Sequence, residues 1–159
     1  MTFSSGVSFC VPLTASNMID IISLQFTIEW DSDVIQFDSV TAFNISGLSI
    51  TEFGLTNTAS GSLAFGWFDN SLVGATLPNG TEIFQLCFTV VGDPNDVTQI
   101  EITDDPVTIE VIEGTMDSDI GLVSQGGVIT VLQSLFITNA DITGTSLSLI
   151  HISEPTRPY

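Results

Sequence analysis

Apolar and polar residues alternate along much of this chain, and this period of two limits the fold more than any other feature. The clearest run lies between residues 21 and 30. Its apolar set is Ile22, Leu24, Phe26, Ile28 and Trp30, and its polar set is Ser23, Gln25, Thr27 and Glu29. Successive side chains of a strand point to opposite sides of a sheet, so this alternation predicts a strand with one buried face.

The same period recurs in the runs 7–13, 63–68 and 84–90. Shorter strand candidates are Val34–Val40, Gly47–Phe53, Gln99–Thr103, Val107–Ile112 and Gly127–Leu132. Segments rich in Gly, Pro, Asn and Asp separate these candidates and indicate turns, and no segment predicts a helix. Short alternating strands joined by regular turns predict an all-β fold, a two-sheet β-sandwich.

The C-terminal part of the chain is expected to lie outside this sandwich. Leu147–Arg157 resembles the translation of a sequencing-library adaptor, so we interpret residues 147–159 as an artefactual tail. Residues 1–132 are expected to form the sandwich, and 133–146 a linker or the start of a next module. The first six residues show no signal peptide, and we interpret the chain as a fragment whose natural start lies upstream.

Charge excludes several classes of partner. The only cationic side chains are His151 and Arg157, both in the suspect tail, and the formal net charge is −18. Binding to nucleic acid or to an anionic membrane surface depends on Lys and Arg, so neither is expected. No apolar run is long enough to insert into a membrane. Only 13% of residues are charged and the mean hydropathy is +0.45, which argues against a disordered acidic chain.

The lack of cationic side chains outside the tail also limits catalysis and metal binding. Without His or Lys, nucleophilic schemes based on Ser–His, Cys–His or a Schiff base are excluded, as is a zinc site of the usual kind. Acidic clusters lie in predicted turns, which does not favour a glycosidase pair. We therefore expect no enzymatic activity and no firm cofactor.

The acidic turns are candidate sites for a calcium ion. Asp31 with Asp33, and Asp93 with Asp96, form oxygen-rich loops of the type that calcium accepts. Asp also favours turns for backbone reasons alone, so both interpretations stay open.

Exposed aromatic side chains would indicate carbohydrate binding. Trp30 and Trp67 share the inward parity of their strands and are expected in the core. Phe68 has the outward parity, beside Asp69, and is expected either in a contact surface or beneath a loop.

Several of these segments together resemble a bacterial cohesin domain of the cellulosome type. Val7–Leu13, Ile21–Trp30 and Val34–Phe37 resemble the opening of such a module. Gly61–Asp69, Gly80–Gly92 and Gly126–Leu132 resemble its later strands, so the likeness covers about Ser5–Leu132. Similar modules occur on large secreted surface proteins.

The resemblance implies a nine-stranded jelly-roll that binds a dockerin-like protein module, usually with calcium on the dockerin. The family's first strand would lie before Ser5, so we expect that strand to be missing and the closing strand to lack its usual neighbour. The implied partner site lies on the outward side of two strands. Its residues are Ser23, Gln25, Thr27, Ala64, Gly66 and Phe68. Family members often carry Asn and Asp where this chain has Ser23 and Gln25.

A disulfide between Cys10 and Cys87 is implied by the same resemblance, which makes their strands neighbours in one sheet. Both cysteines have the outward parity, and an even number of cysteines in an extracellular protein favours pairing. Two free thiols that share parity by chance remain the alternative.

Three functions are compatible with these observations. The first is recognition of a dockerin-like partner by a non-catalytic scaffolding module that is secreted or displayed at the cell surface. The second is a structural or adhesive module that contacts neighbouring domains of a surface protein, and the third is a carbohydrate-binding module.

Overall fold

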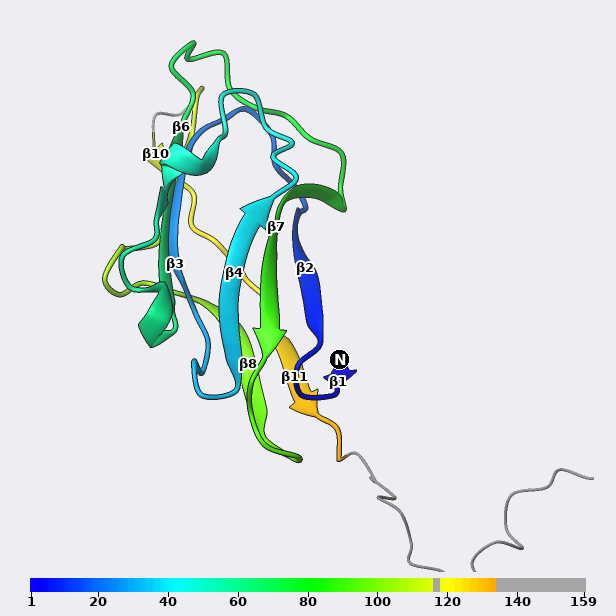
Figure 1. Ribbon diagram of the computed structural model, residues 1–159. Coiled ribbons are helices and arrows are strands. Elements are labelled where there is room, and N and C mark those ends of the chain that lie inside the picture. The colour runs from blue at the N-terminus through cyan, green and yellow to red at the C-terminus, as the bar shows by residue number, and fades with distance from the viewer. Residues whose placement is uncertain (116–117, 134–159) are drawn as a thin grey trace, which may run out of the picture.

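The computed structural model describes residues 1–115 and 118–133, which form two β-sheets packed face to face (Figure 1). Parts of the expected linker (133–146) and all of the expected tail (147–159) lie outside the described residues. The elements are β1 (Thr2–Phe3), β2 (Ser8–Ala15), β3 (Ile21–Glu29), β4 (Ile35–Thr41), η1 (Ile50–Glu52), β5 (Phe53–Gly54), η2 (Thr58–Ser60), β6 (Ser62–Phe68), β7 (Thr81–Val90), β8 (Val97–Thr103), β9 (Glu110–Glu113), β10 (Ser118–Asp119) and β11 (Gly127–Val131).

The two sheets differ in size. The larger has the strand order β1–β11–β8–β3–β6–β5, with β9 and β10 attached beside β3, and the smaller has the order β2–β7–β4. Figure 1 shows β2, β7 and β4 side by side as one layer of the sandwich. This architecture confirms the prediction of an all-β, two-sheet sandwich. No helix in the described part of the chain is long and apolar enough to cross a membrane.

The edge of the larger sheet, where β1 pairs with β11, corrects one expectation. Thr2 and Phe3 pair in parallel with Thr130 and Val131, and the amino group of Met1 donates a hydrogen bond to the carbonyl of Val128 at 2.6 Å. Besides β8, the closing strand β11 therefore has a second, short neighbour in β1, on the side where its usual neighbour was expected to be missing.

The core follows from the alternation. The inward residues of β3, Leu24, Phe26 and Ile28, are at most 5% exposed. Aromatic rings connect the sheets, because Phe65 of β6 lies 4.9 Å from Phe26 and 5.1 Å from Phe84 of β7, measured between ring centroids. Burial of such rings supplies much of the stabilisation of a sandwich.

The tryptophan side chains belong to this core, as their parity predicts. Trp30 is 6% exposed and Trp67 is 2% exposed. The indole N–H of Trp67 donates to the carbonyl of Ser46 at 3.2 Å.

The prediction of a strand over Gly47–Phe53 is wrong for most of its length. Residues Ile50–Glu52 form the 3₁₀ segment η1, and only Phe53 belongs to a strand. Ser49 and Glu52 form a capping box, in which the Ser49 N–H donates to the Glu52 carboxylate at 2.7 Å. This Ser-x-x-Glu pattern satisfies the backbone locally and so competes with strand pairing.

Candidate functional site

The six residues expected at the partner site lie in three cross-strand pairs between β3 and β6. Ser23 pairs with Phe68, Gln25 with Gly66, and Thr27 with Ala64. The residues between them, such as Phe26 and Phe65, point into the core, so the six positions share the outward side of the larger sheet. We call this surface the β3–β6 face.

Thr27 does not contribute accessible surface to this face. It is 0% exposed, because the segment that connects β8 to β9 crosses over it. The hydroxyl of Thr27 accepts a hydrogen bond from the N–H of Val107 at 3.0 Å and lies 3.3 Å from the carbonyl of Val107. The expectation that Thr27 contacts a partner is therefore corrected, and its role is to hold this connection.

Gln25 is also bonded to that connection, through its side-chain amide. Its Nε2 donates to the carbonyl of Thr108 at 3.2 Å, but the residue remains partly exposed. The connection therefore divides the face, and the open part lies toward Ser23 and Phe68.

Small residues occupy the outward positions of the neighbouring strands β5 and β6. Gly54 of β5 pairs with Ala64, and a Cβ atom at Gly54 would lie 3.2 Å from the Cβ of Ala64. A Cβ atom at Gly66 would lie 3.9 Å from the Cβ of Gln25, which leaves room for a side chain there. Phe68, 52% exposed, is the one large exposed aromatic side chain in the described part. A single exposed ring offers no row of stacking platforms for a sugar chain.

Sequence reasoning missed the neighbours of β3 on its other side. Glu101 of β8 pairs with Glu29, Glu110 of β9 pairs with Gln25, and Ile112 of β9 pairs with Ser23. Glu29 has the outward parity of β3, which could have placed it on this face. The strand that lies opposite it could not be predicted from the sequence.

The loop after β6 is closed by the carboxylate of Asp69. It accepts hydrogen bonds from the N–H and hydroxyl of Ser71, at 2.9 and 2.7 Å, and from the N–H of Gly74 at 2.9 Å. These bonds hold the pKa of the Asp69 carboxyl below its usual range, and the bond from the Ser71 hydroxyl contributes most. The loop carries the exposed side chains of Leu72 and Val73 and projects beyond the sheets at the upper end of Figure 1.

Two of the four aspartates considered for calcium use their carboxylates within their own turns. Asp31 accepts from the N–H of Asp33 at 2.9 Å, and Asp96 accepts from the N–H of Asp93 at 2.8 Å. Within residues 1–115 and 118–133, no group of three or more acidic, His or Cys side chains converges in a way that could hold a metal ion.

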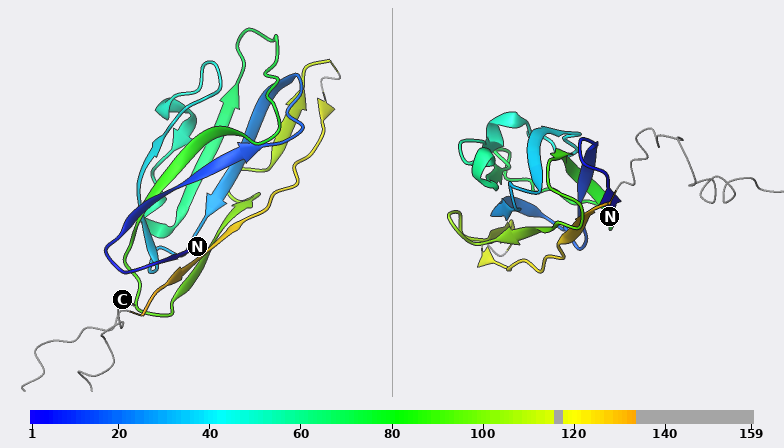
Figure 2. Two further views of the ribbon diagram at one scale, coloured as in Figure 1. Left: turned by 90° about the vertical axis from the view of Figure 1, so that its right-hand side faces the viewer. Right: turned by 60° about the horizontal axis from the view of Figure 1, so that its bottom comes forward.

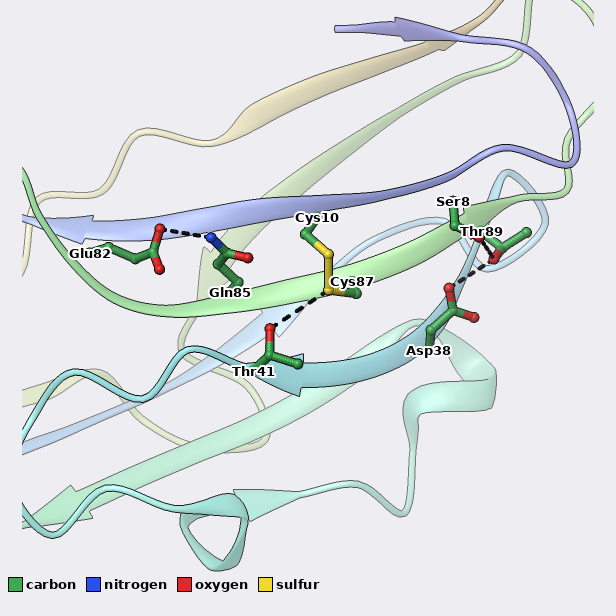
Figure 3. The surroundings of a disulfide bond; sticks show 8 residues. All are labelled: Ser8, Cys10, Asp38, Thr41, Glu82, Gln85, Cys87 and Thr89. Carbon is green, nitrogen blue, oxygen red and sulfur yellow. Dashed lines mark hydrogen bonds between the residues drawn. A yellow bond between two sulfur atoms is a disulfide. The ribbon is translucent and has the colours of Figure 1, made fainter.

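The outward side of the smaller sheet has a different chemistry (Figure 3). A disulfide joins Cys10 of β2 to Cys87 of β7, two residues that are direct register partners with a Cα–Cα distance of 4.0 Å. Beside it, the Thr89 hydroxyl donates to the Asp38 carboxylate at 2.8 Å and lies 2.9 Å from the Ser8 hydroxyl.

A comparison of the sequence with models of protein families identifies the family to which this two-sheet domain belongs. The family profile described as Cohesin domain matches residues 2–116. The chain belongs to the cohesin family. No curated protein matches this cohesin in sequence.

Solved structures show the same fold. This cohesin is similar to the seventh ScaB type I cohesin of Pseudobacteroides cellulosolvens, with a TM-score of 0.68, 18% identity and coverage of 87% of this chain and 91% of the other. A chain in a type I cohesin–dockerin complex of Clostridium thermocellum gives a TM-score of 0.65 at 16% identity, covering 82% and 93%. The non-cellulosomal cohesin of the archaeon Archaeoglobus fulgidus gives 0.64 at 14% identity, covering 83% and 86%.

Proposed function

We propose that this cohesin is a non-catalytic scaffolding module that binds a dockerin-like protein through the open part of its β3–β6 face. The observation that carries the proposal is the pairing of Ser23 with Phe68 and of Gln25 with Gly66 on one outward surface. Cohesin domains bind protein partners, and similar chains occur in complexes with dockerins from Clostridium thermocellum and Acetivibrio cellulolyticus.

The chemistry of the face supports a protein partner. Phe68 is large, apolar and half exposed, and the next outward positions along its strand are the small residues Gly66 and Ala64, against which a partner can pack closely. An exposed apolar patch on a soluble domain often marks a protein contact. One buried anchor of this kind can supply a large share of the affinity of an interface.

A location outside the cytoplasm is part of this proposal. Cohesin domains are typically extracellular scaffold modules, and structural disulfides such as Cys10–Cys87 persist in oxidising compartments.

The direct test is calorimetric titration with a panel of recombinant, calcium-loaded dockerins, including those of the complexes named above. We expect at least one to bind. Gly66→Arg should abolish that binding, because the new side chain would project from an exposed position of this face without entering the core.

The matched control is Gln36→Arg, which adds the same side chain to an exposed position of β4 on the smaller sheet. It should leave the affinity unchanged. Failure of every dockerin to bind, or equal effects of the two arginine variants, would overturn the proposal.

A further inference from the structure

The outer edge of β2 carries backbone groups that bond to no neighbouring strand. β2 pairs with β7 alone, and the N–H of Val90 donates to the carbonyl of Val7 at 2.9 Å. Backbone bonding to a partner alternates along an antiparallel strand, so Ser8 and Cys10 direct their N–H and C=O groups away from β7. The Cα–Cα distance of 4.0 Å between Cys10 and Cys87 is the short spacing of a pair that exchanges no backbone bonds. Within the described part of the chain, no other backbone group bonds to this edge.

A second open edge belongs to β11, on the side of β1. The carbonyl of Val128 accepts from the amino group of Met1, and the N–H of Thr130 donates to the carbonyl of Met1 at 2.9 Å. On the opposite side, Val131 donates to the carbonyl of Asp96. The N–H of Val128 therefore points to the side of β1, and no backbone group among the described residues accepts from it.

An apolar crevice, which we call the β2–β11 crevice, separates these two edges. The residues that line it include Val11 and Leu13 of β2, Ile100 and Ile102 of β8, and Gly126 and Gly127. Phe3 of β1 packs beside it, with its ring stacked on that of Phe9 at a centroid distance of 4.3 Å. Because inward positions alternate along a strand, a strand that continued the line of β1 would place its next inward side chains toward Val11 and Leu13.

The arrangement suits one short strand. β1 is parallel to β11, and the turn of residues 4–7 reverses the chain into β2. A strand along the line of β1 would therefore be parallel to β11 and antiparallel to β2, with open backbone groups on both sides. Pro12 has no N–H, which limits the open ladder of β2 to Ser8–Pro12. A proline on an edge strand restricts pairing with long, unrelated strands.

We propose that the β2–β11 crevice accepts one extended segment of another polypeptide, which adds a strand antiparallel to β2 and parallel to β11. The backbone of this segment bonds to Ser8, Cys10 and Val128, and its alternate apolar side chains pack on Val11 and Leu13. Main-chain bonds supply affinity in this mode of recognition, and the apolar contacts supply selectivity.

Charge specifies the remaining positions of the segment. Residues 1–133 contain no Lys, Arg or His side chain, so the outward positions of the segment are expected to carry Lys or Arg rather than Asp or Glu. The inference goes beyond the proposed function, because the crevice lies between strands that contribute nothing to the β3–β6 face.

The probe is a synthetic peptide of about seven residues, a usual strand length, with Val and Thr in alternation and a Lys at each end. Hydrogen exchange of the isotope-labelled domain is the readout. In the free domain, the amides of Ser8, Cys10 and Val128 should exchange rapidly, whereas those of Phe9 and Val11, which bond to β7, should be protected. Saturating peptide should slow exchange at the first three by at least about tenfold and leave the other two unchanged.

Proline substitutions remove the backbone donors that the segment needs. Ser8→Pro should weaken peptide binding at least about tenfold, through the lost donor and the added ring. The matched control Ser8→Ala removes the contact of the hydroxyl with Thr89 but keeps the N–H, and should leave the affinity unchanged. Val128→Pro, with Val128→Ala as its control, tests the other edge in the same way. Circular dichroism identifies the proline variants that fold, and either one decides.

Four outcomes would overturn the inference. The first is equal binding of a peptide with the same residues in separate Val and Thr blocks, which would show general attraction of cations to an acidic domain. The second is protection of the Ser8 and Cys10 amides in the free monomer, which would show that the edge is already paired. The third is unchanged affinity in a folded proline variant. The fourth is a dimer of the free domain that Ser8→Pro dissociates, which would assign the edge to a second copy. None of these outcomes depends on dockerin binding.

Discussion

The outward sides of the two sheets satisfy their polar groups in different ways. On the smaller sheet, side chains bond to each other, as in Ser8–Thr89–Asp38, Gln85–Glu82 and Cys10–Cys87 (Figure 3). On the larger sheet, Gln25 and Thr27 bond to the backbone of a connecting segment, and Glu29 faces Glu101. The outward polar groups of the smaller sheet therefore bond to one another, whereas the larger sheet leaves two carboxylates opposite each other and the Phe68 ring exposed.

The largest effect on stability should come from removing the disulfide on the outward side of the smaller sheet. Its cysteines are 77 residues apart, and the chain-entropy model then assigns the cross-link about 4–5 kcal/mol of the free energy of unfolding. Reduction, or Cys10→Ser with Cys87→Ser, should lower stability by this order in urea unfolding. Dockerin affinity below the unfolding transition should not change.

Intact mass after alkylation under denaturing, non-reducing conditions checks the bridge itself. Protein produced under oxidising conditions should take up no alkylating agent until it is reduced. Uptake at both thiols without reduction would contradict the pairing, and loss of dockerin affinity on reduction would show that the two faces are coupled.

One substitution made on both faces should give unequal results. Thr27→Val leaves the N–H of Val107 without its acceptor at a buried position, which should cost about 1–3 kcal/mol. Thr89→Val breaks hydrogen bonds at the surface and should cost within about 0.5 kcal/mol.

Urea unfolding of the two valine variants makes this comparison, and hydrogen exchange locates the change. Amides of residues 104–109 should lose protection only in Thr27→Val. Equal losses of stability would show that the connection over β3 is not held by the Thr27 hydroxyl.

The smallest effect on stability should come from lowering the pH. Among the residues that the structure describes, three carboxyls have clearly lowered pKa values, and all three lie on elements or connections of the larger sheet. In each case the largest cause of the lowered pKa is a hydrogen bond to the carboxylate. The donor is the Ser49 hydroxyl for Glu52, the Ser71 hydroxyl for Asp69 and the N–H of Gly121 for Asp119. A lowered pKa stabilises the fold above the ordinary carboxyl pKa of about 4, and this contribution is lost as the pH falls through the lowered value.

Carbon-detected NMR titration should therefore find these three carboxyls titrating below their ordinary values. On acidification, the loop of residues 69–74 should lose order before β2 and β7 do. Ordinary pKa values at all three positions would remove this difference between the sheets.

The sequence predicted the parts of this fold that depend on parity. Alternation in β3 and β6 correctly separated Phe26, Phe65 and Trp67 from the outward positions, since parity is a local property of a strand. It also predicted which residues share the β3–β6 face, but only together with the family resemblance that made the strands neighbours.

The features that could not be predicted depend on contacts between segments that are distant in the sequence. Thr27 has the parity of a surface residue, yet a connection more than 75 residues later in the chain covers it. The exposure of Leu72 and the pairing of Glu29 with Glu101 likewise follow from tertiary structure and register, which no local pattern specifies. The capping residues Ser49 and Glu52, by contrast, were a local signal for η1 that the alternation obscured.

The parallel pairing of β1 with β11 has a mechanical consequence. Both strands run in the same direction at one end of the domain, beside each other in both views of Figure 2. Tension that pulls the start of β1 away from the end of β11 acts along the strands and in opposite senses. Their hydrogen bonds are therefore loaded together in shear, and must break together, whereas an antiparallel hairpin pulled from its open end would unzip one bond at a time.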